Sequence, residues 1–208
     1  DNAVIIGNIF CNNTSTSSGG GVYCINSHGI KFINNTIAYN NSTTGQGGGM
    51  YLMQASPEIY NSIYYGNAAV SGNQFAIVDN LSEPNFYSCI LQGGKPAFYI
   101  PGGVNYQGKM IDCKDVNPDF VTLPAGAGYL NNGLTANWRV KEGSASVNEG
   151  INAVPSINFP AADAYKDSRI RFAKIDIGAC EFYQPAKLVT CANSTISSNK
   201  TSEPIILF

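Results

Sequence analysis

Tyrosine is the residue type in this sequence with the clearest potential for ligand binding, because it recurs along a repeated pattern. Tyr60 and Tyr87 fall at equivalent places, Tyr64 follows shortly after Tyr60, and Tyr51 belongs to a second repeated stretch. Tyrosine rings cover the C–H faces of sugars, and nearby asparagine amides bond to sugar hydroxyls. We therefore expect a glycan-binding surface at these four tyrosines. The alternative is a ladder of tyrosines that stabilises neighbouring strands.

Residues suited to catalysis are sparse. His28 is the only histidine and lies in a Ser-His-Gly turn, without a Ser or Asp partner at a spacing typical of nucleophilic catalysis. Glu58, Asp79 and Glu83 do not fall at equivalent repeat positions, so they do not form the facing pair that glycoside hydrolysis requires. The sequence favours a non-catalytic protein, and we assign no catalytic residue.

Three aspartates in the C-terminal part are the candidate ligands for a cation, namely Asp163, Asp167 and Asp176. Carboxylate oxygens are the ligands that Ca²⁺ prefers. Each of these aspartates also fits a simpler role in a turn or a buried hydrogen bond. We expect no cofactor and no metal, with Ca²⁺ as the alternative.

The six cysteines are an even number, which is compatible with disulfides in an oxidising compartment. The pairs that lie closest in sequence are Cys180 with Cys191 and Cys89 with Cys113. Their spacing does not fix the connectivity. A small buried thiol is the alternative, above all for Cys24.

A repeat must position these residues. The stretch Gly19-Gly20-Gly21-Val22-Tyr23 recurs 28 residues later as Gly47-Gly48-Gly49-Met50-Tyr51, and Ile33-Asn34-Asn35-Thr36-Ile37 aligns 26 residues later with Ile59-Tyr60-Asn61-Ser62-Ile63. Each copy holds short alternating stretches, which place every second side chain on one face. The expected inward residues are Ile33, Asn35, Ile37, Ile59, Asn61, Ile63, Phe86, Ser88 and Ile90, with Val22, Met50, Phe75 and Phe98 from the second stretch.

Strands this short become stable only when they stack coil on coil, about 4.8 Å apart. The sequence therefore predicts an all-β fold, a right-handed parallel β-helix. Residues 1–105 are expected to form its coils, 106–183 a loop-rich C-terminal cap over the open end, and 184–208 a tail. Further coils or a partner are expected before residue 1.

The composition excludes some classes of function. A net charge of −2 with 12% charged residues argues against binding to nucleic acid. No stretch reaches the roughly 18 consecutive apolar residues of a membrane span. We expect neither a nucleic-acid partner nor a span.

The repeat line from Asn34 to Asn40, followed by the Gly47 motif, resembles the parallel β-helix repeats of the pectate-lyase-like superfamily. The later series Asn117-Pro118-Asp119-Phe120 and Asp176-Ile177-Gly178-Ala179-Cys180-Glu181 resembles the closing segment of bacterial choice-of-anchor Q surface proteins. Those proteins are exported and frequent in Bacteroidota. The resemblance implies a secreted or cell-surface protein, such as one at the outer membrane.

Together these observations predict an extracellular module that binds a glycan or a protein partner, or that serves as a subunit of an envelope assembly. The alternative is an enzyme, a polysaccharide lyase or glycoside hydrolase that acts on extracellular polysaccharide.

Overall fold

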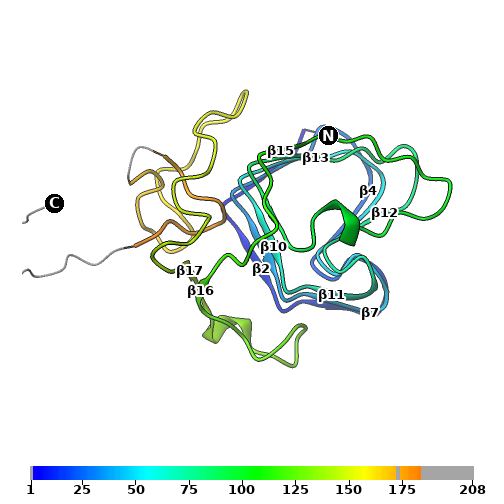
Figure 1. The fold of residues 1–208 in the computed structure, drawn as a ribbon, viewed down its shortest axis with the longest axis horizontal. Coiled ribbons are helices and arrows are strands. Elements are labelled where there is room, and N and C mark those ends of the chain that lie inside the picture. The colour runs from blue at the N-terminus through cyan, green and yellow to red at the C-terminus, as the bar shows by residue number, and fades with distance from the viewer. Residues whose placement is uncertain (1, 172–173, 184–208) are drawn as a thin grey trace, which may run out of the picture.

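The computed structural model describes residues 2–171 and 174–183. It is nearly all β, a parallel β-solenoid of about four turns, and this confirms the predicted β-helix fold. Seen end-on in Figure 1, the coils superimpose, and a C-terminal module lies beside them.

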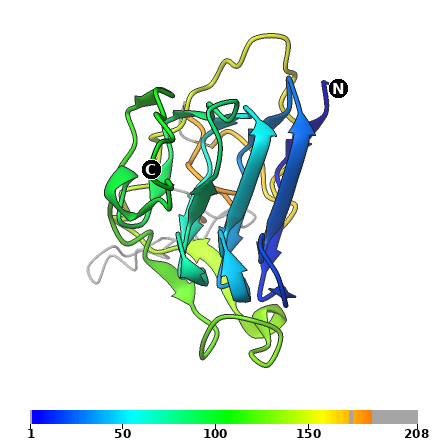
Figure 2. The same cartoon turned by 90° about the vertical axis from the view of Figure 1, so that its right-hand side faces the viewer.

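Four parallel sheets form the walls of the solenoid. The first consists of β1 (Val4–Ile6), β5 (Lys31–Ile33), β9 (Glu58–Tyr60), β13 (Asn85–Tyr87) and β15 (Met110–Ile111). The second consists of β2 (Ile9–Cys11), β6 (Thr36–Ala38), β10 (Ile63–Tyr65) and β14 (Ile90–Leu91). The third consists of β3 (Thr14–Ser15), β7 (Asn41–Gln46) and β11 (Ala68–Ser71), and the fourth of β4 (Val22–Ser27), β8 (Met50–Ala55) and β12 (Phe75–Ile77). Figure 2 faces this fourth sheet and shows its strands as a parallel row.

The interior of the solenoid is apolar, and the predicted inward column of the fourth sheet is confirmed. Val22, Met50, Phe75 and Phe98 all pack into one cluster of core side chains. Phe75 contacts Phe98 with ring centroids 5.0 Å apart. Cross-coil packing of this kind is what stabilises strands that are too short to bury a face alone.

The predicted register of the first stretch is wrong by one residue. Ile33 pairs with Tyr60 and Thr36 pairs with Ile63, so the repeat length here is 27 residues rather than 26. A shift of one residue moves a side chain to the opposite face of a strand. Ile33, Asn61, Ile63, Ser88 and Ile90 consequently lie on the outer side, whereas Asn35, Ile37, Ile59 and Phe86 lie on the inner side as predicted.

The end of the solenoid after the fourth coil is closed by residues 92–109 and not by the later C-terminal residues. The 3-10 turn η1 (Lys95–Ala97) lies across the end of the coils in Figure 1. Phe98 and Tyr106 pack onto the core, and the Tyr106 hydroxyl donates a 2.8 Å hydrogen bond to the Pro84 carbonyl.

The C-terminal module therefore does not cap the end, as the sequence suggested, but packs along the side of the coils. It contains the antiparallel pair β16 (Phe120–Thr122) and β17 (Asn137–Val140) and the 3-10 turn η2 (Gly133–Thr135). Phe120 and Trp138 pack on Ile63 and Ile90, the apolar outer side chains of the second sheet. The only helical elements among the described residues are the two 3-10 turns, and neither has the length or apolar character to cross a membrane.

Candidate functional site, a polar groove beside the last coils

The four tyrosines predicted to bind ligand do not share one surface. Tyr60 and Tyr87 stack in one outer column as predicted, with ring centroids 4.6 Å apart. Tyr60 is only 7% exposed, because Val154 and its neighbours in the C-terminal module cover it. Burial, with the nearby Glu58 carboxylate, raises the pKa of Tyr60 to about 12, so its hydroxyl is neutral. Tyr60 therefore packs between the coils and the C-terminal module and is not available to a ligand.

Tyr64 is not beside Tyr60 on the outer side. It points into the solenoid and is completely buried, with its ring 4.3 Å from that of Phe75. The chain passes a corner between Tyr60 and Tyr64, which sends the two side chains to opposite sides of the wall. A ligand on the surface cannot reach Tyr64.

Tyr51 lies on the outer side of the fourth sheet, away from Tyr60. It stacks on Tyr23 with centroids 4.9 Å apart and planes 5° apart, and Tyr23 is 53% exposed. The stacking covers one face of each of the two rings. Ligand binding at Tyr51 and Tyr87 stays a prediction.

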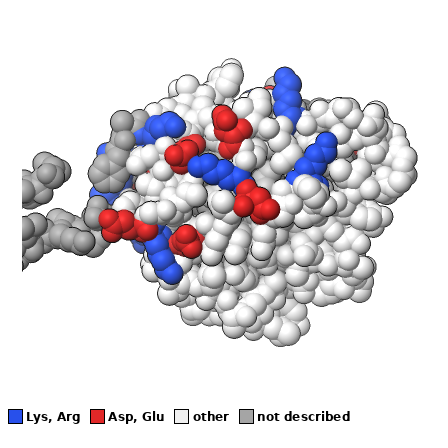
Figure 3. All heavy atoms as spheres, in the orientation of Figure 1, with Lys and Arg blue, Asp and Glu red and all other residues white. Residues whose placement is uncertain are grey.

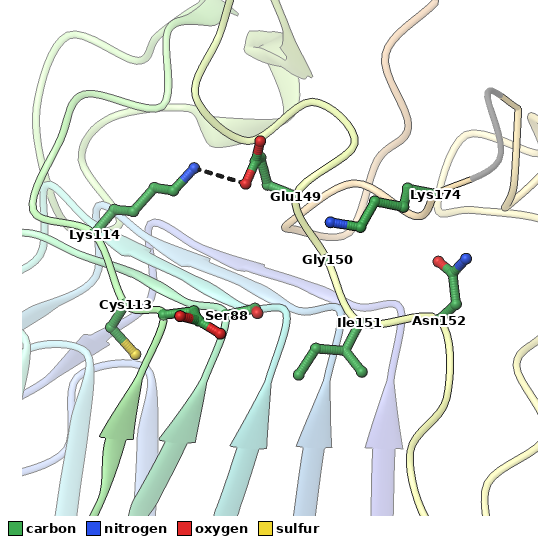
Figure 4. Close-up of a pocket in the computed structure, with 9 residues that line it drawn as sticks. Ser88, Cys113, Lys114, Glu149, Gly150, Ile151, Asn152 and Lys174 are labelled. Carbon is green, nitrogen blue, oxygen red and sulfur yellow. Dashed lines mark ion pairs between the residues drawn. The ribbon is translucent and has the colours of Figure 1, made fainter.

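A groove with a volume of about 720 Å³ opens where the last coils meet the C-terminal module. The coils contribute Ser88, Asp112, Cys113 and Lys114, and the module contributes Glu149, Gly150, Ile151, Asn152 and Lys174. Figure 4 shows these side chains around the opening, with Glu149 between the two lysines in this view. The volume lies within the range of small-ligand sites.

The groove arises from a change along one corner column of the solenoid. Asn34, Asn61, Ser88 and Asp112 follow one another in this column, each with a left-handed backbone (φ 47–53°). Asparagine and aspartate tolerate this conformation better than most residues. At Asn34 and Asn61 the side chains bind the module, whereas Ser88 and Asp112 line open space.

Asn61 holds the module at the point where the groove begins. Its amide donates to the Ile151 carbonyl at 2.9 Å, and its oxygen accepts from the Ile151 N–H at 2.8 Å. Asn34 donates to the carbonyls of Asp176 and Gly178 at 2.8 and 3.1 Å. The segment from Glu149 to Asn152 is thereby fixed against the coils and forms one wall of the groove.

Charges of both signs line the groove. Lys114 forms an ion pair with Glu149 at 3.1 Å and donates to the Ala145 carbonyl at 3.0 Å. Among the described residues, Lys174 has no carboxylate within ion-pair distance, and Asp112 has no basic partner. On the face drawn in Figure 3, charged side chains gather toward the module, and the surface around β7 and β11 shows none. The groove thus offers both hydrogen-bond donors and acceptors in a molecule of low charge.

The candidate disulfide between Cys89 and Cys113 is not formed, and both are free thiols. Cys191, the candidate partner of Cys180, lies outside the described residues. The pairing of Cys180 with Cys191 therefore stays a prediction. Cys24 is a buried thiol of the solenoid core, which matches the alternative foreseen for it.

The aspartates considered as Ca²⁺ ligands bind protein groups. Asp163 accepts from the backbone N–H groups of Tyr165, Asp167 and Glu181, at 2.7–2.8 Å. Asp176 accepts from the Asn148 N–H at 2.6 Å. Within residues 2–171 and 174–183, no group of three or more His, Cys, Asp or Glu side chains is arranged to hold a metal ion.

Comparison with known proteins gives no match to a family model, to a curated protein or to a solved structure.

Proposed function

We propose that this chain is an extracellular binding module that holds a segment of glycan in the groove beside its last coils. The observation that supports this proposal is the groove itself, with Ser88, Asp112, Asn152 and Lys174 converging on one opening. Sugars carry many hydroxyls that both donate and accept, so a lining that mixes amide, hydroxyl, ammonium and carboxylate groups suits them.

An apolar surface next to the groove adds to the fit. Tyr87 packs in the same cluster as Ile151, a lining residue, and Ile111 follows Tyr87 in the outer column. One face of the Tyr87 ring is stacked on Tyr60 and Ile111 is its neighbour on the other side, so the ring offers mainly its edge and hydroxyl to a sugar. Tyr87 is the one tyrosine of the four predicted for binding that lies beside the groove.

The cellular setting of this proposal comes from the sequence. The motif series resembles exported choice-of-anchor Q surface proteins of Bacteroidota with pectate-lyase-like repeats, so we place the module in secreted material or at the cell surface. A protein partner or a larger envelope assembly is compatible with the same location.

The proposal is tested by screening the chain on an array of neutral and uronic-acid oligosaccharides, followed by calorimetry with the best binder. Lys174→Ala should weaken binding about tenfold or more, since a hydrogen bond from a charged donor contributes about 1.5–3 kcal/mol. Lys109→Ala is the matched control, because Lys109 is exposed and outside the groove. Absence of binding to every glycan, or equal losses in both variants, would contradict the proposal.

A second candidate function is hydrolysis of a glycosidic bond, because two carboxylates, Asp112 and Glu149, line one groove. Hydrolysis by two carboxylates requires one to act as acid and the other as base or nucleophile. Release of reducing ends from polysaccharide, lost in Asp112→Asn, would support it. A product that absorbs ultraviolet light through a new double bond would indicate a lyase instead.

A further inference from the structure

Two cysteines occupy neighbouring positions on the last two coils. Ile90 and Lys114 pair in parallel register, which places Cys89 and Cys113 side by side. The Lys114 N–H donates a 2.8 Å hydrogen bond to the Cys89 carbonyl. Neighbouring residues of parallel strands are about 4.8 Å apart, and disulfides join Cα atoms about 4.4–6.8 Å apart. The backbone thus already has a spacing that a disulfide accepts.

The two thiols continue a ladder of polar side chains inside the solenoid. Asn35 accepts from the Asn8 N–H at 2.9 Å, and Ser62 accepts from the Asn35 N–H at 3.1 Å. In the next steps of the column, Cys89 and then Cys113 replace these residues. The Cys113 sulfur interacts with the thiol and the backbone N–H of Cys89, and the Cys89 thiol also lies within hydrogen-bond distance of the Ile59 and Tyr87 carbonyls, at 3.4 and 3.3 Å.

These hydrogen bonds give the two sulfurs different character. The Cys89 thiol bond lowers the pKa of Cys113, although burial and the Asp112 carboxylate oppose this effect. Burial raises the pKa of Cys89 well above its ordinary value. A thiolate is the nucleophile in thiol chemistry, so Cys113 is the sulfur prepared to attack and Cys89 the one prepared to hold its proton.

Access separates the two sulfurs in the same way. Cys113 is partly exposed, whereas Cys89 is completely buried. A reagent in solvent therefore meets Cys113 first.

We propose that Cys113 and Cys89 form a thiol–disulfide exchange site that accepts a low-molecular-weight disulfide such as oxidised glutathione. The Cys113 thiolate attacks one glutathione sulfur, the S–S bond breaks, and glutathione thiolate leaves. Cys89 then releases its proton to solvent, and its sulfur attacks the Cys113 sulfur and expels the second glutathione. Two protein thiols are oxidised to one disulfide, and one glutathione disulfide is reduced to two thiols.

The other described cysteines lack this arrangement. Burial raises the pKa values of Cys11, Cys24 and Cys180, and the strand neighbours of Cys11 and Cys24 are Ala38 and Leu52. These cysteines serve as internal references, because their reaction with the same reagent can be compared with that of Cys113 in the same protein.

The test uses the full chain with Cys191→Ser in every variant, since that residue lies outside the described range. After incubation with oxidised glutathione, mass spectrometry should show the loss of two hydrogens and a linked pair of peptides containing Cys89 and Cys113. Cys89→Ser should instead accumulate a glutathione adduct on Cys113, because the second attack is removed. Cys113→Ser should show neither product, and Cys24→Ser should behave as the parent.

A kinetic measurement on the chain with both Cys89 and Cys113 in place tests the proposal even if the variants fail to fold. Iodoacetamide at pH 7 should label Cys113 faster than Cys11, because the pKa of the Cys113 thiol is lowered and burial raises that of Cys11. Equal labelling rates, an adduct at another cysteine in Cys89→Ser, or a disulfide that excludes Cys89 would each overturn the proposal.

Discussion

Replacement of Asn61 by alanine should detach the C-terminal module from the coils more effectively than any other single change at the corner column. The Asn61 side chain is fully buried and forms two hydrogen bonds with the Ile151 backbone. It also donates to the Asn34 oxygen at 3.2 Å. Alanine removes all three bonds and leaves the Ile151 N–H and carbonyl without their partners.

The expected cost follows from these contacts. Each unsatisfied backbone group costs about 1–3 kcal/mol, and Ile151 lines the groove, where water relieves part of the penalty. We take about 2–4 kcal/mol for the two unsatisfied backbone groups of Ile151 together. The left-handed backbone at Asn61 (φ 47°) adds about 1 kcal/mol for alanine. Asn61→Ala should therefore lower the free energy of unfolding by about 3–5 kcal/mol.

Asn26→Ala is the matched control, because Asn26 has the same backbone (φ 48°) but is exposed and does not contact the module. It should cost only about 1 kcal/mol. Urea unfolding followed by circular dichroism measures both values. A difference of less than 1 kcal/mol between the two variants would refute the role of Asn61 in holding the module. Asn61→Ala should also abolish binding in the groove, since Ile151 forms its wall.

Three further predictions concern buried groups. Tyr60→Ala should lower the free energy of unfolding by about 3 kcal/mol or more, because the ring is covered and stacked. Tyr23→Ala should lower it by about 1 kcal/mol or less, because Tyr23 is exposed. Urea unfolding measures both values, and equal losses would contradict the assignment of Tyr60 to packing. Burial, with the nearby Asp176 charge, raises the pKa of Glu181 to about 8, so the folded state holds this proton more tightly than the unfolded state. That contribution to stability is complete below about pH 4.5 and is lost as the pH rises through about 8. The urea concentration at the unfolding midpoint should therefore fall between pH 5 and pH 8. Glu181→Gln should make this midpoint depend less on pH. Finally, oxidation of Cys89 with Cys113 should raise the free energy of unfolding by about 3.5 kcal/mol, the value expected for a closed loop of about 25 residues. An unchanged thermal midpoint after complete oxidation would show that the bond strains the coils.

The fold was predictable from the sequence because the solenoid repeats its chemistry. The triple glycine before Val22 recurs 28 residues later before Met50, and this match identifies the inward column that continues to Phe75 in β12. This sheet has one apolar and one solvent-exposed side. Alternation therefore identifies its inner face.

The register of the first stretch was not predictable in the same way. Ile63 and Ile90 are apolar although they point outward, because Trp138 and Phe120 cover them. Where both sides of a strand are buried, alternation no longer distinguishes inside from outside. An alignment that matched Ile33 to Ile59 was therefore as consistent with the sequence as the true pairing of Ile33 with Tyr60.

The groove was beyond sequence reasoning because its two walls are far apart in the chain. Ser88 and Asp112 are neighbours in the corner column, but they face Glu149 and Lys174 only because the module folds back along the coils. One signal was present in the sequence. The corner residue changes from asparagine at Asn34 and Asn61 to serine at Ser88, which marks where docking of the module ends.

The lateral position of the module has a consequence for how the molecule unfolds. In a simple solenoid each coil contacts only its neighbours, so terminal coils fray independently of the rest. Here the Thr36 hydroxyl of an early coil binds the Ala179 N–H, 143 residues away, and Asn12 of the first coil donates to the Gly126 carbonyl. Because one segment ties the first three coils together, separation of any one of them breaks contacts shared with the others. The chain should consequently unfold as one cooperative unit, with hydrogen exchange in the early coils governed by global opening and not by local fraying.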